Sequence, residues 1–475
     1  MDFSWSLIVD LGIIAGSLLL ATFLRVKIPF FQKYLIPNAL TAGFIILPYY
    51  NFLAPYHGID THGLGMLVYH LLNLAFIAMT LRILPFSPAA RKKGNIYAHS
   101  TGTLSQYAIQ TVVGLVLVLV FIHTLFPDLD PGFGFLLPLG FVLGPGQAYA
   151  IGQGWESLGF TGASSLGLTF AAIGFLWGCF GGVFLMNYGI RKGWIEKPFL
   201  EKLSRRGTRS GLLSKEEQTP CGTMLTTDSE AIDSLTYHAA LIFFVYLFSF
   251  LLLKLLTWLL GFLGPMGQQF ADSLWGINFI FSALTAMIFR EIMKALKISH
   301  TMDNATLTRV SGLSIDLMVT AAIGAISLVV VRAYWLPILI TTVAGGTLTI
   351  VTTPWLCSRL FTDHRFHRTI MIYGASTGTM PTGLSLLRAM DPEFETPVAT
   401  EYMFSSGITF SLAIPLILVV NYPTLSKFQG NPLLFWIALG VSACYVIYVA
   451  VAFLLVAKKR AFARSSQVWL EDEPE

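Results

Sequence analysis

Two short stretches of the chain place hydroxyl and amide side chains beside Gly and Pro within otherwise apolar sequence. The first is Gly144-Pro145-Gly146-Gln147, and the second runs from Ser376 to Thr382. Gly and Pro interrupt helices, so both stretches would leave backbone N–H and C=O groups without helical partners. Freed N–H groups suit an anion, while freed carbonyls suit a cation. We expect a small solute to bind here, through Gly144, Gly146, Gln147, Ser376, Thr377, Thr379 and Thr382. The alternative is that the Ser and Thr hydroxyls satisfy the backbone of their own turn.

A coupling-ion site is predicted around an acidic residue inside an apolar run. Asp316 lies about seven residues, or roughly 10 Å of helix rise, beyond the edge of the run at Arg309. A carboxylate at that depth is costly and normally faces a cavity or a partner. Its oxygens suit sodium, with Asn73 and Thr379 as further ligands, or they could bind a proton. The alternatives are an ion pair for Asp316 and an interhelical hydrogen bond for Asn73.

Three other polar residues stand near the ends of apolar runs. Arg388 could bind a distal carboxylate of the solute in a bidentate pair. The alternative for Arg388 is a cytoplasmic anchor or a partner for Asp391 or Glu393. Glu401 and His99 are expected at the membrane interface.

Two other classes of function compete with solute transport. Residues 374–378 match the GxSxG frame of serine hydrolases, but the chain has no histidine after His367 to serve as the base. A channel is the stronger rival, because re-entrant hairpins also build selectivity filters. The Cys and His residues lack metal-site spacing, so we expect no cofactor, no structural metal and no enzymatic activity.

The composition identifies the setting in which these residues must work. Of 475 residues, 55% are apolar and only 12% are charged, and the mean hydropathy is +0.68. Soluble proteins carry about 25% charged residues, so the chain is predicted to be an integral membrane protein. Apolar runs of about 20 residues indicate spanning helices rather than β-strands. The partners we expect are lipid, a small solute and a coupling ion, but not nucleic acid.

Apolar runs bounded by charge, Gly or Pro predict eleven membrane-spanning helices. They cover residues 4–24, 35–54, 64–84, 100–126, 160–188, 236–262, 270–289, 310–331, 334–358, 398–421 and 433–457. Two further stretches, 135–155 and 370–390, are too short and too rich in Gly and Pro to cross alone. We expect these two to be re-entrant hairpins.

The basic residues orient this topology. With the N-terminus outside, nearly all Lys and Arg residues fall in cytoplasmic loops, and the C-terminus is cytoplasmic. This agreement requires each hairpin to enter and leave on one side, the first from outside and the second from inside.

A polar segment divides the chain into two similar halves. Residues 1–188 and 235–421 each hold five spans with a hairpin before the fifth, and residues 189–234 form a cytoplasmic linker. The first half starts outside and the second starts inside, so the halves form an inverted repeat. Residues 422–475 add one spanning helix and a cytoplasmic tail. The predicted fold class is an all-α polytopic membrane protein of the kind found in secondary transporters.

Several stretches resemble the bacterial sodium/glutamate symporter family. Lys33-Tyr34-Leu35-Ile36-Pro37 followed by NALTAGFII is similar to the family's second-helix entry. LGPGQAYAIGQGWESLGFTGASSLGLTFAAIGFLWGCFGG is similar to its first hairpin and following helix, and GASTGTMPTGLSLLRAMD to its second. The family's glutamate transporters carry Gly-His-Gly-Thr-Gly where this chain has residues 144–148, Gly-Pro-Gly-Gln-Ala.

The resemblance implies a function and an assembly. It implies sodium-coupled import of glutamate or a related small carboxylate or amino acid across a bacterial inner membrane. It also implies a homodimer in which a mobile domain carries the hairpins past a static scaffold.

Overall fold

The computed structural model describes residues 5–57, 59–83, 93–194, 223–228, 230–262, 264, 271, 274–391, 396–463 and 469. Every regular element within these ranges is a helix. Most of the predicted linker and most of the C-terminal tail lie outside them. The principal helices are α1 (Ser6–Lys27), α3 (Asn38–Pro48), α4 (His62–Leu81), α5 (Lys93–His123), α7 (Pro145–Glu156), α8 (Ala163–Leu176), α9 (Gly182–Lys192), α12 (Ser234–Gly261), α14 (Asn278–Ala295), α15 (Asn304–Gly324), α17 (Trp335–Leu360), α18 (Arg365–Met390), α19 (Val398–Leu418) and α21 (Pro432–Ala457). The shorter ones are α2 (Pro29–Lys33), α6 (Leu136–Pro138), α16 (Leu328–Ala333) and α20 (Tyr422–Phe428).

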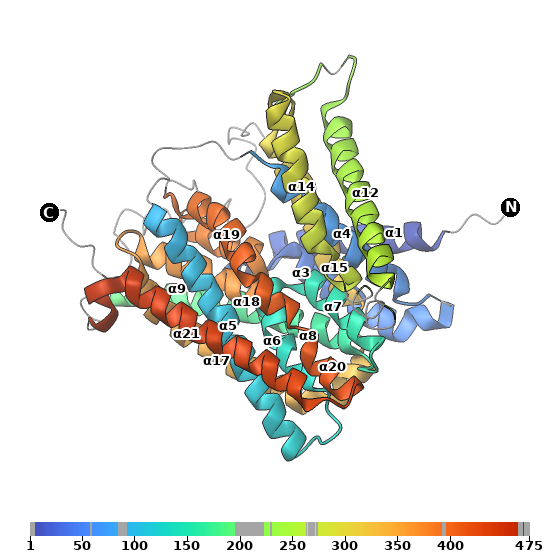
Figure 1. The fold of residues 1–475 in the computed structure, drawn as a ribbon. Coiled ribbons are helices and arrows are strands. Elements are labelled where there is room, and N and C mark those ends of the chain that lie inside the picture. The colour runs from blue at the N-terminus through green and yellow to red at the C-terminus, as the bar shows by residue number, and fades with distance from the viewer. Residues whose placement is uncertain are drawn as a thin grey trace.

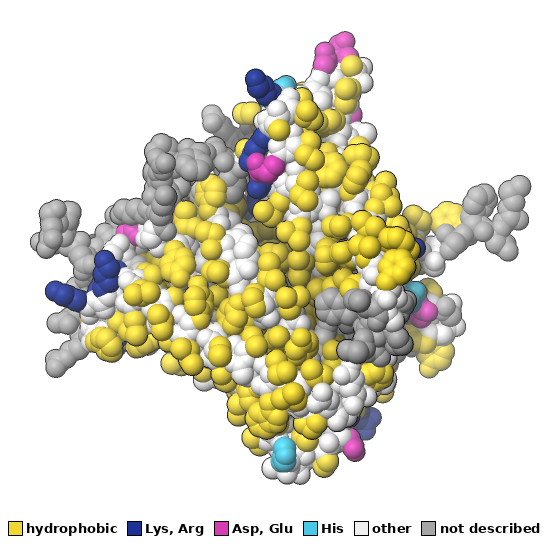
Figure 2. Space-filling model, in the orientation of Figure 1, with side chains coloured by type: hydrophobic (Ala, Val, Ile, Leu, Met, Phe, Trp, Pro, Cys, Tyr) yellow, Lys and Arg dark blue, Asp and Glu magenta, His cyan; other side chains and the backbone are white. Residues whose placement is uncertain are grey.

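Nine helical stretches within the described residues are long and apolar enough to cross a membrane, which fits the predicted all-α membrane protein. They are Ser6–Lys27, His62–Leu81, Gly94–His123, Ala163–Lys192, Ser234–Gly261, Asn304–Gly324, Trp335–Leu360, Val398–Phe428 and Pro432–Phe462. Hydrophobic side chains cover most of the face seen in Figure 2, and charged ones gather at its margins. Only 22% of each apolar window in α1, α12 and α21 is buried, against 72% in Ala163–Lys192, where nearly all residues of α8 are buried.

Two predicted spans differ from this pattern. The first, 35–54, contains α3, which ends at Pro48 and continues as the π-helix Tyr49–Leu53 and the 3-10 helix Ala54–His57. The proline inside the run explains why a regular helix ends there. The second, 270–289, corresponds to α14, which begins later than predicted and includes charged residues near its end, Arg290, Glu291 and Lys294.

Local sequence explains several helix boundaries. Asp233, Asp303 and Asn431 each accept a hydrogen bond from a backbone N–H in the first turn of α12, α15 and α21. Such caps satisfy N–H groups that have no partner inside the helix. At its C-terminus, α9 stops at Gly193, whose φ of 71° lies in the left-handed region that glycine favours.

The helices pack in two groups. One contains α1, α3, α4, α12, α14 and α15, and the other contains α5, α17, α18, α19 and α21 with residues 131–156 and α8–α9. In Figure 1, α5 and α21 cross in front of α18 and α8, while α12 and α14 project at the top of the view. The groups meet where α7 contacts α4 and α15.

Residues 131–156 form two helical limbs separated at Gly144. The first limb joins the 3-10 helix Pro131–Phe135, α6 and the π-helix Leu139–Leu143, and the second limb is α7. Both outer ends of this segment lie against α20, because Thr424 Oγ1 donates to Asp130 Oδ1 (2.9 Å) and Trp155 Nε1 donates to Asn421 Oδ1 (2.8 Å). The segment therefore returns to the side from which it starts.

Helix α18 is interrupted in the same way. Gly378 and Thr379 leave helical geometry, with φ, ψ values of −145°, 28° and 72°, 170°. The two limbs pack on each other so closely that a Cβ on Gly374 would lie 2.6 Å from the Cα of Gly383. In an uninterrupted helix these two residues would be about 13 Å apart, so α18 folds back on itself at the interruption.

Candidate solute-binding site

The two interruptions touch each other in the interior. Gly144 has φ 96° and ψ −179°, nearly the backbone conformation of Thr379, and a Cβ on Gly144 would lie 2.3 Å from Thr379 Cγ2. Only glycine adopts this conformation without strain, so the threonine is held there by its surroundings. The sequence predicted both breaks, and the structure brings them together.

Helix ends of opposite polarity converge at this junction. Helix α7 begins at Pro145 with no side-chain cap, and the second limb of α18 begins after Thr379 with Pro381 in its first turn. Two helix N-termini that meet here create a partial positive charge that suits an anion such as a carboxylate. The first limb of residues 131–156 ends at Leu143, and the first limb of α18 ends at Thr377. The C-terminal carbonyls of both limbs therefore also lie at the junction, where they suit a cation.

The predicted hydroxyl residues divide into two kinds. Thr377 Oγ1 donates to Tyr373 O (2.9 Å) and Thr382 Oγ1 donates to Gly378 O (2.5 Å), so these hydroxyls satisfy the backbone of their own segment. Ser376 Oγ is fully buried and has no hydrogen-bond partner among the described residues. Thr379 is partly exposed at the junction. Ser376 is therefore the predicted hydroxyl best placed for a bound solute.

The other predicted residues of the first stretch surround the junction. Gln147 is 5% exposed, and its Oε1 lies 3.9 Å from a Cβ built on Gly144. A Cβ on Gly146 would lie 2.6 Å from Leu72 of α4 and 2.9 Å from Met318 Sδ of α15. The break at Gly144 therefore lies between the break at Thr379 and the helix group that contains α4 and α15.

Three predicted site residues lie away from the junction. Asn73 is buried, accepts a hydrogen bond from Ser282 Oγ (2.8 Å) and donates to Tyr69 O (2.8 Å), which is the interhelical alternative. Asp316 is exposed on α15, on the face opposite the buried Met318. Arg388 is exposed nine residues beyond Thr379, about 13 Å along the limb, so the structure does not bring it to the junction.

Sequence reasoning missed a polar face on α5 that reaches the junction. Gln110 Nε2 donates to Ser376 O (3.1 Å) and to Thr349 Oγ1 (2.9 Å), and Gln106 Oε1 accepts from Thr352 Oγ1 (3.0 Å). Among the described residues, no partner satisfies three other buried atoms: Gln106 Nε2, Tyr107 OH and Gln110 Oε1. Buried polar atoms without partners are costly, so this face suits a polar ligand or water. The run of Ser, Thr and Gln between residues 99 and 111 was the available signal.

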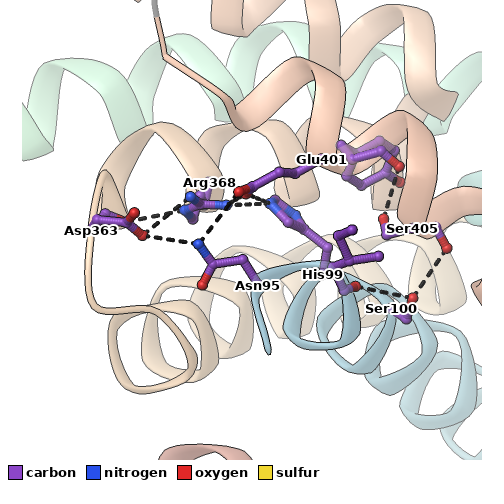
Figure 3. Close-up of polar contacts among 9 residues, drawn as sticks. Asn95, His99, Ser100, Asp363, Arg368, Glu401 and Ser405 are labelled. Carbon is purple, nitrogen blue, oxygen red and sulfur yellow. Dashed lines mark hydrogen bonds and ion pairs between the residues drawn. The ribbon is translucent and has the colours of Figure 1, made fainter. Parts of the chain in front are cut away.

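A second polar cluster lies at the end of α5 nearest Lys93 (Figure 3). Arg368 Nη1 contacts both Glu401 Oε2 and His99 Nε2, the latter at 2.8 Å, and Nη2 lies 3.1 Å from Asp363 Oδ1. Asn95 Nδ2 donates to Asp363 Oδ1 (3.3 Å). His99 and Glu401 are 0% and 1% exposed, so both side chains are enclosed between helices, and their place at the membrane interface stays a prediction. Their neighbours are far away in sequence, which is why the spacing of residues did not group them.

Comparisons with known proteins leave the family open. A scan of protein-family models, a search of curated proteins and a search of solved structures each return no match to this chain. The geometry of the junction and the residues that line it are therefore the basis on which a function can be assigned.

Proposed function

We propose that this protein is a cation-coupled secondary transporter that imports a small carboxylate or amino acid by alternating access. The observation that carries the proposal is the contact between Gly144 and Thr379, where two interrupted helices meet inside a protein with nine apolar spanning helices among its described residues. Interrupted backbone within a membrane requires a polar or water-filled setting, and secondary transporters place their substrate and ion sites at such breaks. The two segments would then be the re-entrant hairpins that the sequence predicts.

The packing of the helices supports an inverted repeat. Helix α1 packs on α3 as α12 packs on α14, α3 packs on α15 as α14 packs on α4, and α4 packs on α15. Exchanging α1 with α12, α3 with α14 and α4 with α15 leaves this set of contacts unchanged. Two halves related in this way can exchange conformations, which provides the outward-open and inward-open states of a transporter.

The grouping of loops supports the predicted sidedness. Asp130 and α20 belong to loops predicted outside, and Trp155 ends the hairpin predicted to enter from outside. Arg368 and the start of α5 belong to loops predicted inside, and Glu401 lies at the predicted inner end of the span 398–421. We propose an N-terminus outside and a cytoplasmic C-terminus in a bacterial inner membrane.

The substrate class follows from the donors at the junction. The N-termini of α7 and of the second limb of α18 suit a carboxylate, while Gln106, Gln110 and Ser376 offer neutral hydrogen-bonding groups to the rest of a small polar solute. The resemblance to sodium/glutamate symporters makes glutamate the first substrate to test and sodium the first coupling ion. That resemblance also underlies a homodimer with elevator-like movement of the group that contains α18.

Uptake into proteoliposomes tests this proposal. The purified protein is reconstituted, and accumulation of radiolabelled L-glutamate is measured with an inward sodium gradient, with an inward proton gradient and with neither. Accumulation that requires a cation gradient is the expected result. If folded protein accumulates neither glutamate nor competing dicarboxylates and amino acids under any gradient, the proposal is wrong.

A further inference from the structure

The histidine in the buried cluster has only one protonation state compatible with its contacts. His99 Nε2 lies 2.8 Å from Arg368 Nη1. A guanidinium only donates hydrogen bonds, so Nε2 must accept, and the imidazole is neutral with its proton on Nδ1. His99 Nδ1 is buried and has no partner among the described residues. One further proton can therefore enter at Nε2 only if the bond with Arg368 breaks.

A carboxylate that could pair with a protonated His99 lies beside it. Glu401 Oε2 lies 3.9 Å from His99 Nε2 and at present contacts Arg368 Nη1. Among the described residues, ionisable groups near this set include Asp363 on Arg368, Tyr402 of α19 with its ring 5.7 Å from that of His99, and Cys357 of α17. Arg365 and His367 lie within one turn of Arg368 on α18. A protonated His99 would take Glu401 as its partner and repel Arg368.

The cluster is connected to the junction by two helices. On α5, residues 99, 103, 106 and 110 follow one another at helical spacing on one face. On α18, the limb that carries Arg368 continues to Ser376 and Thr379. Hydrogen bonds between these helices include His99 with Arg368 and Gln110 with Ser376 O. A change in the first contact therefore acts on the limb that forms half of the junction.

We infer that His99 is a proton-binding site whose occupancy releases the first limb of α18 from α5, which makes a proton a coupling ion of transport. A hydronium ion supplies the proton: its O–H bond breaks as the N–H bond forms at Nε2, and a water molecule is left. The hydrogen bond between Arg368 Nη1 and Nε2 is lost in the same step, and the proton returns to water when that hydrogen bond re-forms. The role in coupling rests on the proposed function, whereas the proton site itself does not.

Hydrogen–deuterium exchange tests the site without any substrate. Exchange of residues 365–377 is compared at pH 4.5 and pH 7.5, after correction for the intrinsic effect of pH on amide exchange. In the wild type we expect exchange at least threefold faster at the lower pH. His99→Gln should exchange equally at both values, and the control His70→Gln, whose histidine contacts Tyr246 outside the cluster, should behave as the wild type. Equal pH responses in the wild type and in His99→Gln would overturn the inference. If His99→Gln does not fold, Glu401→Gln replaces it, and an unchanged pH response there overturns the inference in the same way.

Transport separates this inference from the proposed function. L-Glutamate uptake is measured with a proton gradient alone and with a sodium gradient alone. We expect the proton gradient to drive uptake in the wild type and His99→Gln to lose at least tenfold of that uptake. Uptake driven by sodium alone would overturn proton coupling and leave the proposed function standing. Exchange that depends on His99, without uptake under either gradient, would support the proton site and reject glutamate transport.

Discussion

Replacing Gly144 by Ala would test whether the two interruptions meet as described. The alanine would occupy φ 96°, ψ −179°, which costs about 1–3 kcal/mol in backbone strain. Its Cβ would lie 2.3 Å from Thr379 Cγ2, and overpacking of this kind costs about 1–3 kcal/mol. The smaller entropy of the unfolded alanine chain offsets about 0.4–1 kcal/mol. We therefore expect Gly144→Ala to destabilise the protein by about 1–5 kcal/mol.

A second substitution separates the two costs. Thr379→Ser removes the Cγ2 methyl and keeps the hydroxyl, so in the double variant the overpacking disappears while the strain at residue 144 remains. The double variant should recover about 1–3 kcal/mol relative to Gly144→Ala, as a positive coupling between contacting residues. Unfolding in detergent, followed by tryptophan fluorescence with increasing denaturant or temperature, measures all four members of the cycle.

The matched control lies on the same helix. Gly154 of α7 has no positive φ, and no heavy atom lies within 4 Å of the position that a Cβ would take there, so Gly154→Ala should stabilise the helix by about 0.5–1 kcal/mol. Opposite signs at positions 144 and 154 are the expected outcome. Wild-type stability in Gly144→Ala, or no recovery in the double variant, would refute the contact between the interruptions.

Three further changes test other parts of the structure. Gln110→Ala removes the two hydrogen bonds that Gln110 donates to Thr349 and Ser376 and should lower uptake at least tenfold. Gln153→Ala, on the exposed side of α7, should leave uptake unchanged. Equal uptake by the two variants would exclude the α5 face from the site. Glu401→Leu removes the buried carboxylate from Arg368 Nη1 and leaves Asp363 as the remaining carboxylate partner, so it should cost about 3 kcal/mol. An unchanged unfolding midpoint would show that the pair is not buried. Asp303→Ala removes the cap of α15 and should cost about 1 kcal/mol at pH 7. Burial opposes ionisation of Asp303, but hydrogen bonds from the side chain and backbone of the first turn outweigh it and lower the pKa of this carboxyl. Because a lowered pKa contributes stability above the unfolded value of about 3.9, the difference from wild type should shrink as the pH falls below about 4; a constant difference would contradict this.

The sequence determined the class of fold and the places where it is interrupted. The apolar composition and the recurring runs of about 20 residues predict membrane-spanning helices, because a membrane leaves few other ways to satisfy the backbone. The Gly and Pro residues around positions 144 and 379 predict breaks for an equally local reason, since they act on the backbone of their own segment. Sequence alone also identified Ser376 and Thr379 as polar groups beside a break.

Only the tertiary structure decided which of these groups meet. Gly144 and Thr379 touch although 235 positions separate them in the sequence, and Arg388 lies away from both although it is close in sequence to Thr379. The buried pairing of Arg368 with Glu401 and His99, and of Gln110 with Ser376, depends on how α5, α18 and α19 pack. Spacing along one helix reports its own faces, whereas a contact between helices depends on the relative positions that packing imposes, and no local pattern of residues contains that information.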